Sequence, residues 1–575
     1  MKNFITLKVK MIIWIILSTS IALGCSSSES KKEDNNMKIV ATKIFKNATI
    51  YTVNAHQEWA QAIAIKGNEI IFVGSDKEVE NYIGPQTIIT DLKGKMMMPG
   101  FHDVHIHPIE SGSQNTQFSL DTDELNAENF IDTIAQASYQ NPNSKWLIGY
   151  GHSIFALFES SISPLEIINE AVPDRPVIIM EHTSHSMWVN SAALELANID
   201  SNTPNPIGGI IVKDEITGEP NGVLIDNAGN LVMDLAMTPT AQSMQADYDG
   251  LVQFTLPELA KNGITSISDA RSFWQRNDHL TWQKVEKNNE LTARVAVGLW
   301  AYPELDDNKQ LESLISLYSN QEDSFLRFNQ IKLYSDGILI NTTAAMFDEY
   351  EIKLLDIKTN NGVNYFTQSR VEKYIKALEP KGFDFHIHAI GDRGIYESLN
   401  AIENAASSQG RHRITHVEIV DPADYTRFAQ LNVTADAQVA GEFTNPEHWH
   451  ENEELIGVVR SDNAVPIKSL NDAGARITLS SDWSVSPFNP FLGLQNAVTR
   501  YPQALTLKQA IEAYTINGAY VMRQEHKVGT IEVGKLADLV ILDRNIFDVE
   551  PNTINQTKVV MTMLNGEVIY QDQRK

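Results

Sequence analysis

Two histidines separated by one residue, His105 and His107, are the first side chains in this 575-residue chain whose spacing suggests chemistry. They follow a short apolar run and a Pro99-Gly100 turn. On a β-strand, residues two apart point to the same face, so both imidazoles aim at one point while Ile106 faces away. Neutral imidazoles are common zinc ligands. A lone His-x-His pair is weak support for a metal site, so the remaining ligands must come from elsewhere in the chain.

Further polar candidates stand at the ends of apolar, β-rich runs: Lys332, His388, His416 and Asp482. Each has a simpler explanation when taken alone. A strand histidine is often a hydrogen-bonded core residue, a lysine can extend its amine to the surface, and an aspartate can cap a helix. His386 shares a face with His388 and is an alternative ligand, but His388 is nearer the following loop. Together with the first pair, these residues predict one metal site.

Eight β-rich segments with helical connections between most of them predict an α/β fold with a (β/α)₈ TIM-like barrel. The predicted strands are 96–104, 263–269, 294–300, 329–336, 383–388, 413–420, 432–438 and 476–482. In such a barrel, functional groups lie at the carboxyl ends of the strands. The barrel is expected over 96–524, with an inserted subdomain at about 110–260.

Both ends of the chain carry short strands and two-residue hairpin signals. Gly67-Asn68 joins two β-rich runs near the start, and Asn565-Gly566 joins two more near the end. Because each segment is too small to be stable alone, we expect residues 38–95 and 525–575 to form one small β-sandwich-like domain beside the barrel.

The first 37 residues have the pattern of a bacterial lipoprotein leader. Residues 1–24 combine lysines with a short apolar segment, as in a signal peptide. Cys25, the single cysteine, follows a lipobox-like run and is the predicted lipidation site, with 25–37 as a flexible tether. We therefore expect a lipid anchor in a membrane of the bacterial cell envelope, at the periplasmic face or the cell surface.

The formal net charge is −27 at pH 7. Such a surface repels a phosphate backbone, which argues against nucleic acid as a partner. The oligomeric state stays open, with a homodimer among the alternatives.

The order of these residues resembles the amidohydrolase superfamily. Its amidohydrolase 3 branch, which includes proteins similar to N-substituted formamide deformylases, is indicated by flanking motifs over essentially the whole chain from about residue 38. Those motifs are Lys332 to Gly337 with the following Thr342-Thr343-Ala344-Ala345, His388-Ala389-Ile390-Gly391-Asp392-Arg393, Ser481-Asp482-Trp483 and Gly529 to Leu539.

The resemblance implies a role for each matching residue. His105 and His107 would hold one divalent metal, and His388 and His416 a second. Lys332, carboxylated by CO₂, would bridge the two ions. Asp482 would bind metal and take the proton from the attacking water. Zinc suits imidazole and carboxylate ligands, with iron, manganese or nickel as alternatives and with one or two ions open.

Two positions in the inserted segment are predicted to contact substrate. His185 resembles a pocket histidine of the family, although a merely structural role is the alternative. Asp226 stands where relatives usually have glutamate. The sequence also departs from the family pattern at residues 338–343. The resemblance therefore does not identify a specific substrate for this chain.

The favoured function is hydrolysis of a C–N bond, amide or N-acyl/N-formyl, in a small molecule by a metal-activated water, with Asp482 as the catalytic proton carrier. A deaminase of a cyclic amidine is the nearest rival, but Gly391-Asp392 supplies no glutamate after the fifth strand. A catalytically inactive, small-molecule-binding lipoprotein is the third reading. The complete ligand set argues against it.

Overall fold

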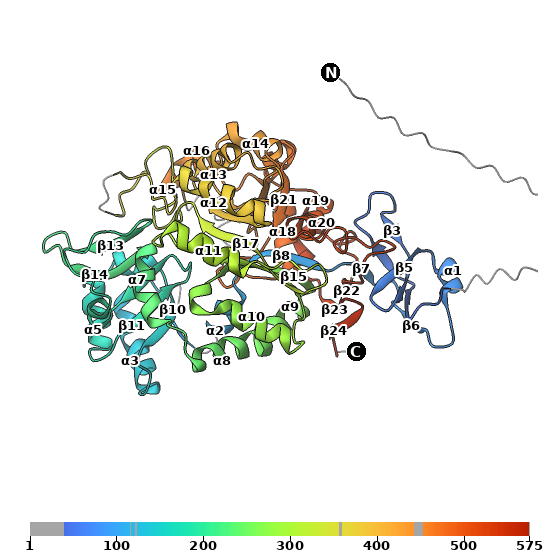
Figure 1. The fold of residues 1–575 in the computed structure, drawn as a ribbon, viewed down its shortest axis with the longest axis horizontal. Helices are drawn as coiled ribbons and strands as arrows, with labels where there is room; N and C mark the ends of the chain where they lie inside the picture. Colours follow the sequence, from blue (N-terminus) through green and yellow to red (C-terminus); the bar gives the residue numbers. More distant parts are fainter. Residues whose placement is uncertain (1–38, 115–116, 121–122, 356–358, 442–451, 574–575) are drawn as a thin grey trace, which may run out of the picture. The chain divides into compact units, whose positions relative to one another are not determined.

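The computed structural model describes residues 39–573 except 115–116, 121–122, 356–358 and 442–451 (Figure 1). The chain divides into the compact units Met1–Ile39 and Val40–Lys575, and the fold described here is that of the second unit. The predicted signal peptide, the tether and Cys25 lie outside the described residues. Within the described part, no helix combines the length and the apolar character needed to cross a bilayer.

A parallel sheet of eight strands, adjacent in sequence order, forms the barrel (Figure 1). The strands are β8 (Phe101–Ile106), β15 (Ile264–Ser272), β16 (Arg294–Trp300), β17 (Leu326–Tyr334), β18 (Asp384–Ala389), β19 (Arg413–His416), β20 (Thr434–Ala437) and β21 (Arg476–Leu479). At the carboxyl ends, β8 and the segment after β21 are joined by backbone hydrogen bonds. Asp482 N–H donates to His105 O over 2.8 Å, and His107 N–H donates to Trp483 O over 2.8 Å. The predicted α/β barrel is confirmed.

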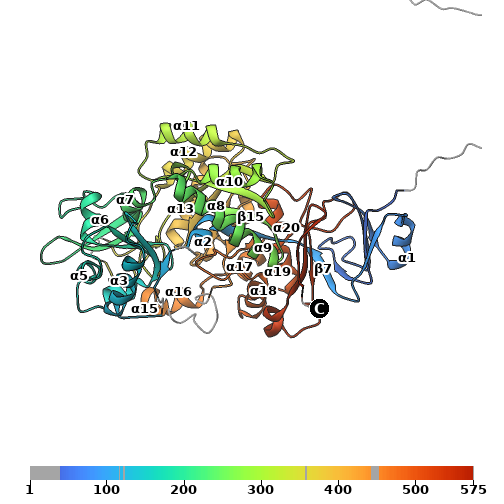
Figure 2. The same ribbon diagram turned by 90° about the horizontal axis from the view of Figure 1, so that it is seen from below.

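Amphipathic helices surround the strands (Figures 1 and 2). They include α9 (Leu256–Lys261), α10 (Asp278–Lys287), α11 (Asp307–Leu317), α12 (Gln368–Leu378), α13 (Asp392–Asn404), α14 (Tyr425–Gln430), α17 (Ile467–Asp472), α18 (Pro490–Thr499), α19 (Leu507–Tyr514) and α20 (Ile516–Val521). In α12, Val371, Tyr374 and Ile375 are buried at helical spacing, and the Thr367 side chain caps the first turn. The Thr506/Gln509 capping box that starts α19 is present.

The first predicted strand, 96–104, is two strands in two sheets. β7 (Met96–Pro99) pairs with β2 (Thr49–Tyr51) and β22 (Leu539–Leu542), whereas β8 belongs to the barrel. Gly100 separates them and donates its N–H to Asp538 O. A Cβ on Gly100 would lie 2.3 Å from Thr265 Oγ1, so this close approach requires glycine.

Two further sheets gather the strands from both ends of the chain. One has the order β5 (Glu69–Gly74), β4 (Ala62–Lys66), β1 (Lys43–Lys46) and β6 (Ile88–Asp91). The other has the order β24 (Glu567–Gln571), β23 (Val559–Leu564), β22, β7, β2 and β3 (Trp59–Ala60). Gly67 and Gly566 have positive φ angles of 64° and 80° in the β4–β5 and β23–β24 hairpins, as such turns demand.

The segment between β8 and β15 builds a mixed sheet of its own. Its order is β13 (Gly209–Lys213), β14 (Pro220–Asp226), β12 (Ser186–Val189), β11 (Val177–Glu181), β10 (Leu147–His152) and β9 (Phe118–Ser119). Helices α3 (Ile131–Gln140), α5 (Pro164–Ala171), α6 (Ser191–Leu196) and α7 (Asn227–Ala236) lie with this sheet (Figures 1 and 2). Asp226 ends β14, and His185 directly precedes β12, so both predicted substrate residues stand at strand ends.

Candidate active site

His105 and His107 converge on Asp482, as the spacing of the pair predicts. Both histidines are buried at the end of β8. Asp482 Oδ1 lies 3.1 Å from His105 Nε2 and 2.9 Å from His107 Nε2. One carboxylate oxygen therefore faces two imidazole nitrogens, and the backbone bond from Asp482 N–H to His105 O fixes the two strand ends together.

His388 and His416 complete a cluster of imidazoles around His105. The His416 ring centroid lies 4.9 Å from that of His105 and 4.4 Å from that of His388. His388 Nε2–H donates to Gly337 O over 3.0 Å, which leaves His388 Nδ1 with its lone pair. Nδ1 is buried and has no hydrogen-bond partner in the described structure. An imidazole oriented in this way is suited to bind a metal ion.

Lys332 is fully buried beneath this cluster. Its amine has no hydrogen-bond partner among the described residues and lies 5.3 Å from the centroid of the Tyr334 ring. A buried ammonium without a partner is costly, because it loses its hydration and gains nothing in exchange. Burial accordingly lowers the pKa of Lys332 well below its ordinary value. The neutral amine is the form that can react with CO₂.

Burial keeps His105, His388 and His416 neutral, and the Asp482 carboxylate is ionised. Burial lowers the pKa of His105 and His388 well below the ordinary value, and that of His416 to about 3. Burial alone would raise the pKa of Asp482, but the adjacent His105 and His107 hold it well below its usual range. Neutral imidazoles and an ionised carboxylate are the protonation states that metal ligands need.

Two residues of this cluster have left-handed backbone conformations. His416 has a φ of 79° and Asp482 a φ of 57°. Residues other than glycine adopt such angles at an energetic cost, and they do so most often at functional sites. At these positions, the chain turns out of the strand and directs each side chain over the end of the barrel.

Among the described residues, two groups of side chains have ligand atoms within 4.8 Å of one another: His105, His416 and Asp482, and His105, His386 and Asp436. In the second group, His386 Nδ1 accepts from Arg413 Nη2 over 2.7 Å. Asp436 accepts hydrogen bonds from Thr415, Thr478, Ser480 and Gln438. His105 belongs to both groups, but His386 Nδ1 and the Asp436 carboxylate already accept hydrogen bonds, so the first group is the better candidate metal site.

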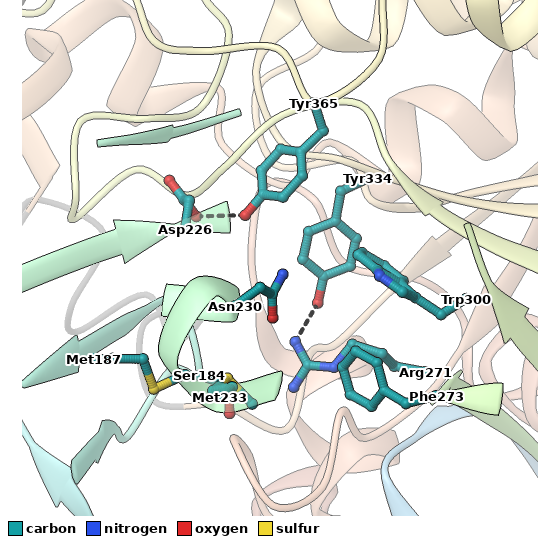
Figure 3. A pocket seen from close by; sticks show the side chains of 10 residues that line it. All are labelled: Ser184, Met187, Asp226, Asn230, Met233, Arg271, Phe273, Trp300, Tyr334 and Tyr365. Carbon is teal, nitrogen blue, oxygen red and sulfur yellow. Dashed lines mark hydrogen bonds between the residues drawn. The ribbon is translucent and has the colours of Figure 1, made fainter. Parts of the chain in front are cut away.

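A pocket adjoins the histidine cluster, and the space between its lining residues, open solvent included, is about 330 Å³ (Figure 3). Its lining comprises Ser184, Met187, Asp226, Asn230, Met233, Arg271, Phe273, Trp300, Tyr334 and Tyr365. The ring of Tyr334 joins the pocket to the cluster, because it stacks on His388 with centroids 4.2 Å apart. The pocket walls come from β15, β16, β17 and the inserted sheet with α7.

His185 and Asp226 lie together at this pocket. His185 Nδ1–H donates to Asp226 Oδ1 over 2.7 Å, and Tyr365 O–H donates to the same oxygen over 3.0 Å. The His185 ring stacks on Tyr334 with centroids 5.3 Å apart. A Cβ on Gly337 would lie 2.6 Å from Asp226 Oδ2, so glycine permits this close approach.

Sequence reasoning missed Glu110, Arg271, Tyr334 and Tyr365. Arg271 Nη2 donates to both oxygens of Glu110 over 3.0 and 2.9 Å, and Arg271 Nη1 donates to Tyr334 Oη over 3.0 Å. One signal was available, since Tyr334 lies two residues beyond Lys332 and so shares its strand face. Nothing in the sequence pairs Arg271 with Glu110, 161 positions away.

The comparisons with known proteins agree on one family. The model of the amidohydrolase family matches residues 89–570. The YtcJ protein of Bacillus subtilis is 29% identical over 552 residues, covering 92% of this chain and 99% of that protein. The N-substituted formamide deformylase of Arthrobacter pascens is 24% identical over 547 residues, covering 91% and 97%. An uncharacterised metal-dependent hydrolase from Pyrococcus horikoshii shares the fold with a TM-score of 0.69 at 24% identity, covering 88% and 99%.

Proposed function

The chain belongs to the amidohydrolase family, and we propose that it is a metal-dependent hydrolase that cleaves a C–N bond in an amide or N-acyl compound. The convergence of His105, His107 and Asp482, with His388 and His416 beside them, is the observation that carries this proposal. The name of the Arthrobacter pascens relative, a deformylase of N-substituted formamides, supports an N-acyl substrate class.

The side chains present fit one or two divalent ions. His105, His107 and Asp482 would hold one ion, and His388 and His416 a second, with Lys332 carboxylated between them. Two buried atoms without hydrogen-bond partners in the described structure, Lys332 Nζ and His388 Nδ1, are what such a site requires. The imidazole-rich set favours zinc, ahead of iron, manganese or nickel. A divalent ion bound there would supply an acidified water and a polarised substrate carbonyl.

Asp482 is the proton carrier in this proposal. Its carboxylate is ionised and lies at the end of the barrel, where β8 and the segment after β21 meet. It accepts the proton of the attacking water and delivers that proton to the nitrogen that leaves.

The Asp482→Asn variant tests this role. The amide keeps the size of the side chain but cannot accept the proton, so turnover of N-acyl and N-formyl amines should fall by about 10²–10⁴-fold. Amine release by the purified protein, with metal content measured by mass spectrometry, gives the comparison. Asp472→Asn, an exposed aspartate paired with Lys468, is the control that should keep full activity. Unchanged turnover in Asp482→Asn would remove this residue from the mechanism.

We also propose that Cys25 anchors the protein in the bacterial cell envelope, on the basis of the lipobox-like run before it. The Cys25→Ser variant should move from the membrane fraction to the soluble fraction of the expressing cells. Wild-type protein that is already soluble would contradict this anchor and leave the enzymatic proposal untouched.

A further inference from the structure

The imidazole of His105 has close polar neighbours at both of its nitrogens. Nε2 lies 3.1 Å from Asp482 Oδ1, on the side of the candidate metal site. Nδ1 faces the neighbouring barrel strands and lies 2.8 Å from Thr415 Oγ1 and 3.0 Å from His386 Nε2. A neutral imidazole carries its hydrogen on one nitrogen only, so the neighbours of Nδ1 decide whether Nε2 keeps a lone pair.

His386 offers a hydrogen-bond donor to His105 Nδ1. The Nδ1 atom of His386 accepts from Arg413 Nη2 over 2.7 Å, so the hydrogen of the neutral His386 ring lies on Nε2. That N–H group is the one that reaches His105 Nδ1. If His105 accepted this hydrogen bond, its own hydrogen would lie on Nε2, and no lone pair would face the metal site.

Thr415 offers an acceptor to the same nitrogen. Its single hydroxyl hydrogen is donated to Asp436 Oδ2 over 2.7 Å, because a carboxylate is a stronger acceptor than an imidazole nitrogen. Thr415 Oγ1 therefore turns a lone pair toward His105 Nδ1, and it also accepts from Gln438 Nε2 over 3.0 Å. When His105 carries its hydrogen on Nδ1 and donates it to Thr415, its Nε2 is free to bind an ion.

The orientation of the Thr415 hydroxyl is fixed by the buried carboxylate of Asp436. Thr415 and Asp436 are paired on the adjacent strands β19 and β20, and both are completely buried. Thr478 O–H donates to Asp436 Oδ1 over 2.8 Å, and Ser480 O–H donates to Oδ2 over 2.8 Å. Turning the Thr415 hydrogen toward His105 would take a donor away from a buried carboxylate, which is costly.

We propose that Asp436, acting through the Thr415 hydroxyl, holds His105 in the tautomer whose Nε2 can bind a metal ion. The His386 N–H is the competing donor that this arrangement excludes. The choice is between two uncharged forms of one ring, so the charge of His105 does not change. Asp436 and Thr415 are positioning residues, because they act on the ligand His105. The inference rests on the proposed function, since it takes His105 Nε2 as a ligand of the metal site.

Zinc affinity in the absence of substrate tests this role. Thr415→Val keeps the shape of the side chain and removes the hydroxyl, so His105 Nδ1 is left with the His386 N–H. The loss of an outer partner of a metal-ligating histidine weakens metal binding by about 10–100-fold, and we expect that loss here. Titration of the purified protein with zinc against a chromophoric chelator gives the dissociation constant. Thr415→Ser restores the hydroxyl and should restore the wild-type affinity.

Thr478→Val is the matched control, because it removes a hydroxyl from the same carboxylate. The Thr478 hydroxyl donates to Asp436 Oδ1 and is not bonded to His105 in the described structure. The free energy of unfolding should fall by a similar amount in Thr478→Val and Thr415→Val. The zinc affinity of Thr478→Val should equal that of the wild type, so the two measurements separate stability from positioning.

Removal of the competing donor gives a second test. In His386→Asn, the amide oxygen can accept from Arg413 in place of Nδ1, and the side chain is too short to replace Nε2. The double variant Thr415→Val/His386→Asn should therefore bind zinc more tightly than Thr415→Val alone. A general defect in packing predicts the opposite, because the two losses of affinity would then add.

Equal zinc affinity in Thr415→Val and the wild type would overturn the inference, as would an equal loss in Thr415→Val and Thr415→Ser. Asp436→Asn should weaken zinc binding as Thr415→Val does, and if it does not fold, the Thr415 variants decide. Wild-type protein that binds zinc but releases no amine from N-acyl or N-formyl amines would contradict the proposed function and leave this inference standing. Wild-type protein that binds no divalent ion would overturn both.

Discussion

The histidine cluster and the neighbouring pocket are both lined by buried polar groups, but the two regions differ in how many of those groups are paired with one another. In the cluster, Lys332 Nζ and His388 Nδ1 have no hydrogen-bond partner in the described structure. In the pocket, Arg271 is paired with Glu110, and Asp226 Oδ1 accepts from His185 and Tyr365, while Asp226 Oδ2 has no hydrogen-bond partner among the described residues. The two regions share the ring of Tyr334, which stacks on His388 and lines the pocket.

The difference follows from what each region has to bind. A buried polar atom without a partner is destabilising, so a cluster of them indicates a ligand that supplies the missing interactions. Neutral nitrogens arranged around one point need a cation. In the pocket, the Arg271–Glu110 ion pair is already formed and needs no ligand, whereas Asp226 Oδ2 can still accept a hydrogen bond. The cluster is therefore arranged for metal ions, and the pocket keeps one carboxylate oxygen that can accept a hydrogen bond from a ligand.

Removing Lys332 should have the largest effect. Lys332→Ala deletes the group proposed to lie between the ions, so metal content should fall to half or less of the wild-type value. The several kcal/mol that a metal site supplies to the transition state correspond to a loss of about a thousandfold in kcat/KM. Mass spectrometry of metal content and an amine-release assay measure both quantities. Wild-type stoichiometry in this variant would remove Lys332 from the ligand set.

Variants of His388 and His386 test which of these two histidines binds metal. His388→Asn removes a free Nδ1 and should lower metal stoichiometry. His386→Asn removes a side chain that is bonded to Arg413 and His105. That change should preserve stoichiometry at saturating zinc and lower the free energy of unfolding by about 1–3 kcal/mol. The opposite outcome, with metal lost from His386→Asn and retained in His388→Asn, would favour the second group of ligands, which contains His386 and Asp436.

The barrel and the strand-end positions of the cluster could be predicted because their signals are local. Period-two spacing puts His105 and His107 on one face, and a polar residue after an apolar run marks a strand end. The break at Gly100 escaped prediction, since Met96 to Val104 reads as one continuous β-rich segment and only tertiary packing assigns it to two sheets. The left-handed backbones of His416 and Asp482 are likewise invisible in the residue types.

The pocket could not be predicted because its interactions are long-range. Arg271 and Glu110 come from opposite sides of the insertion, and Asp226 and Tyr365 are separated by 139 positions. No periodicity links such pairs. His185 and Asp226 were named from a family resemblance, and the structure places them in direct contact with one another.

The smallest expected effect belongs to Tyr365→Phe, which removes a single hydrogen bond to Asp226. Hydrogen bonds to charged groups contribute about 1.5–3 kcal/mol, so the free energy of unfolding in denaturant should fall by that amount. Affinity for an N-acyl amine substrate should weaken less than tenfold, because the ring still lines the pocket, and metal content should stay at the wild-type value.

Tyr374→Phe is the control, because the Tyr374 hydroxyl lies away from the pocket, where it donates to Asp307 over 2.9 Å and accepts from Gln310 over 2.6 Å. This variant loses two hydrogen bonds, so it should cost at least as much stability as Tyr365→Phe and leave ligand affinity unchanged. Equal loss of affinity in both variants would mean that the pocket responds to general destabilisation. A loss of metal in Tyr365→Phe would mean that the pocket and the histidine cluster are coupled. A change on the pocket side of the Tyr334 ring would then alter His388, which stacks on the opposite side of that ring.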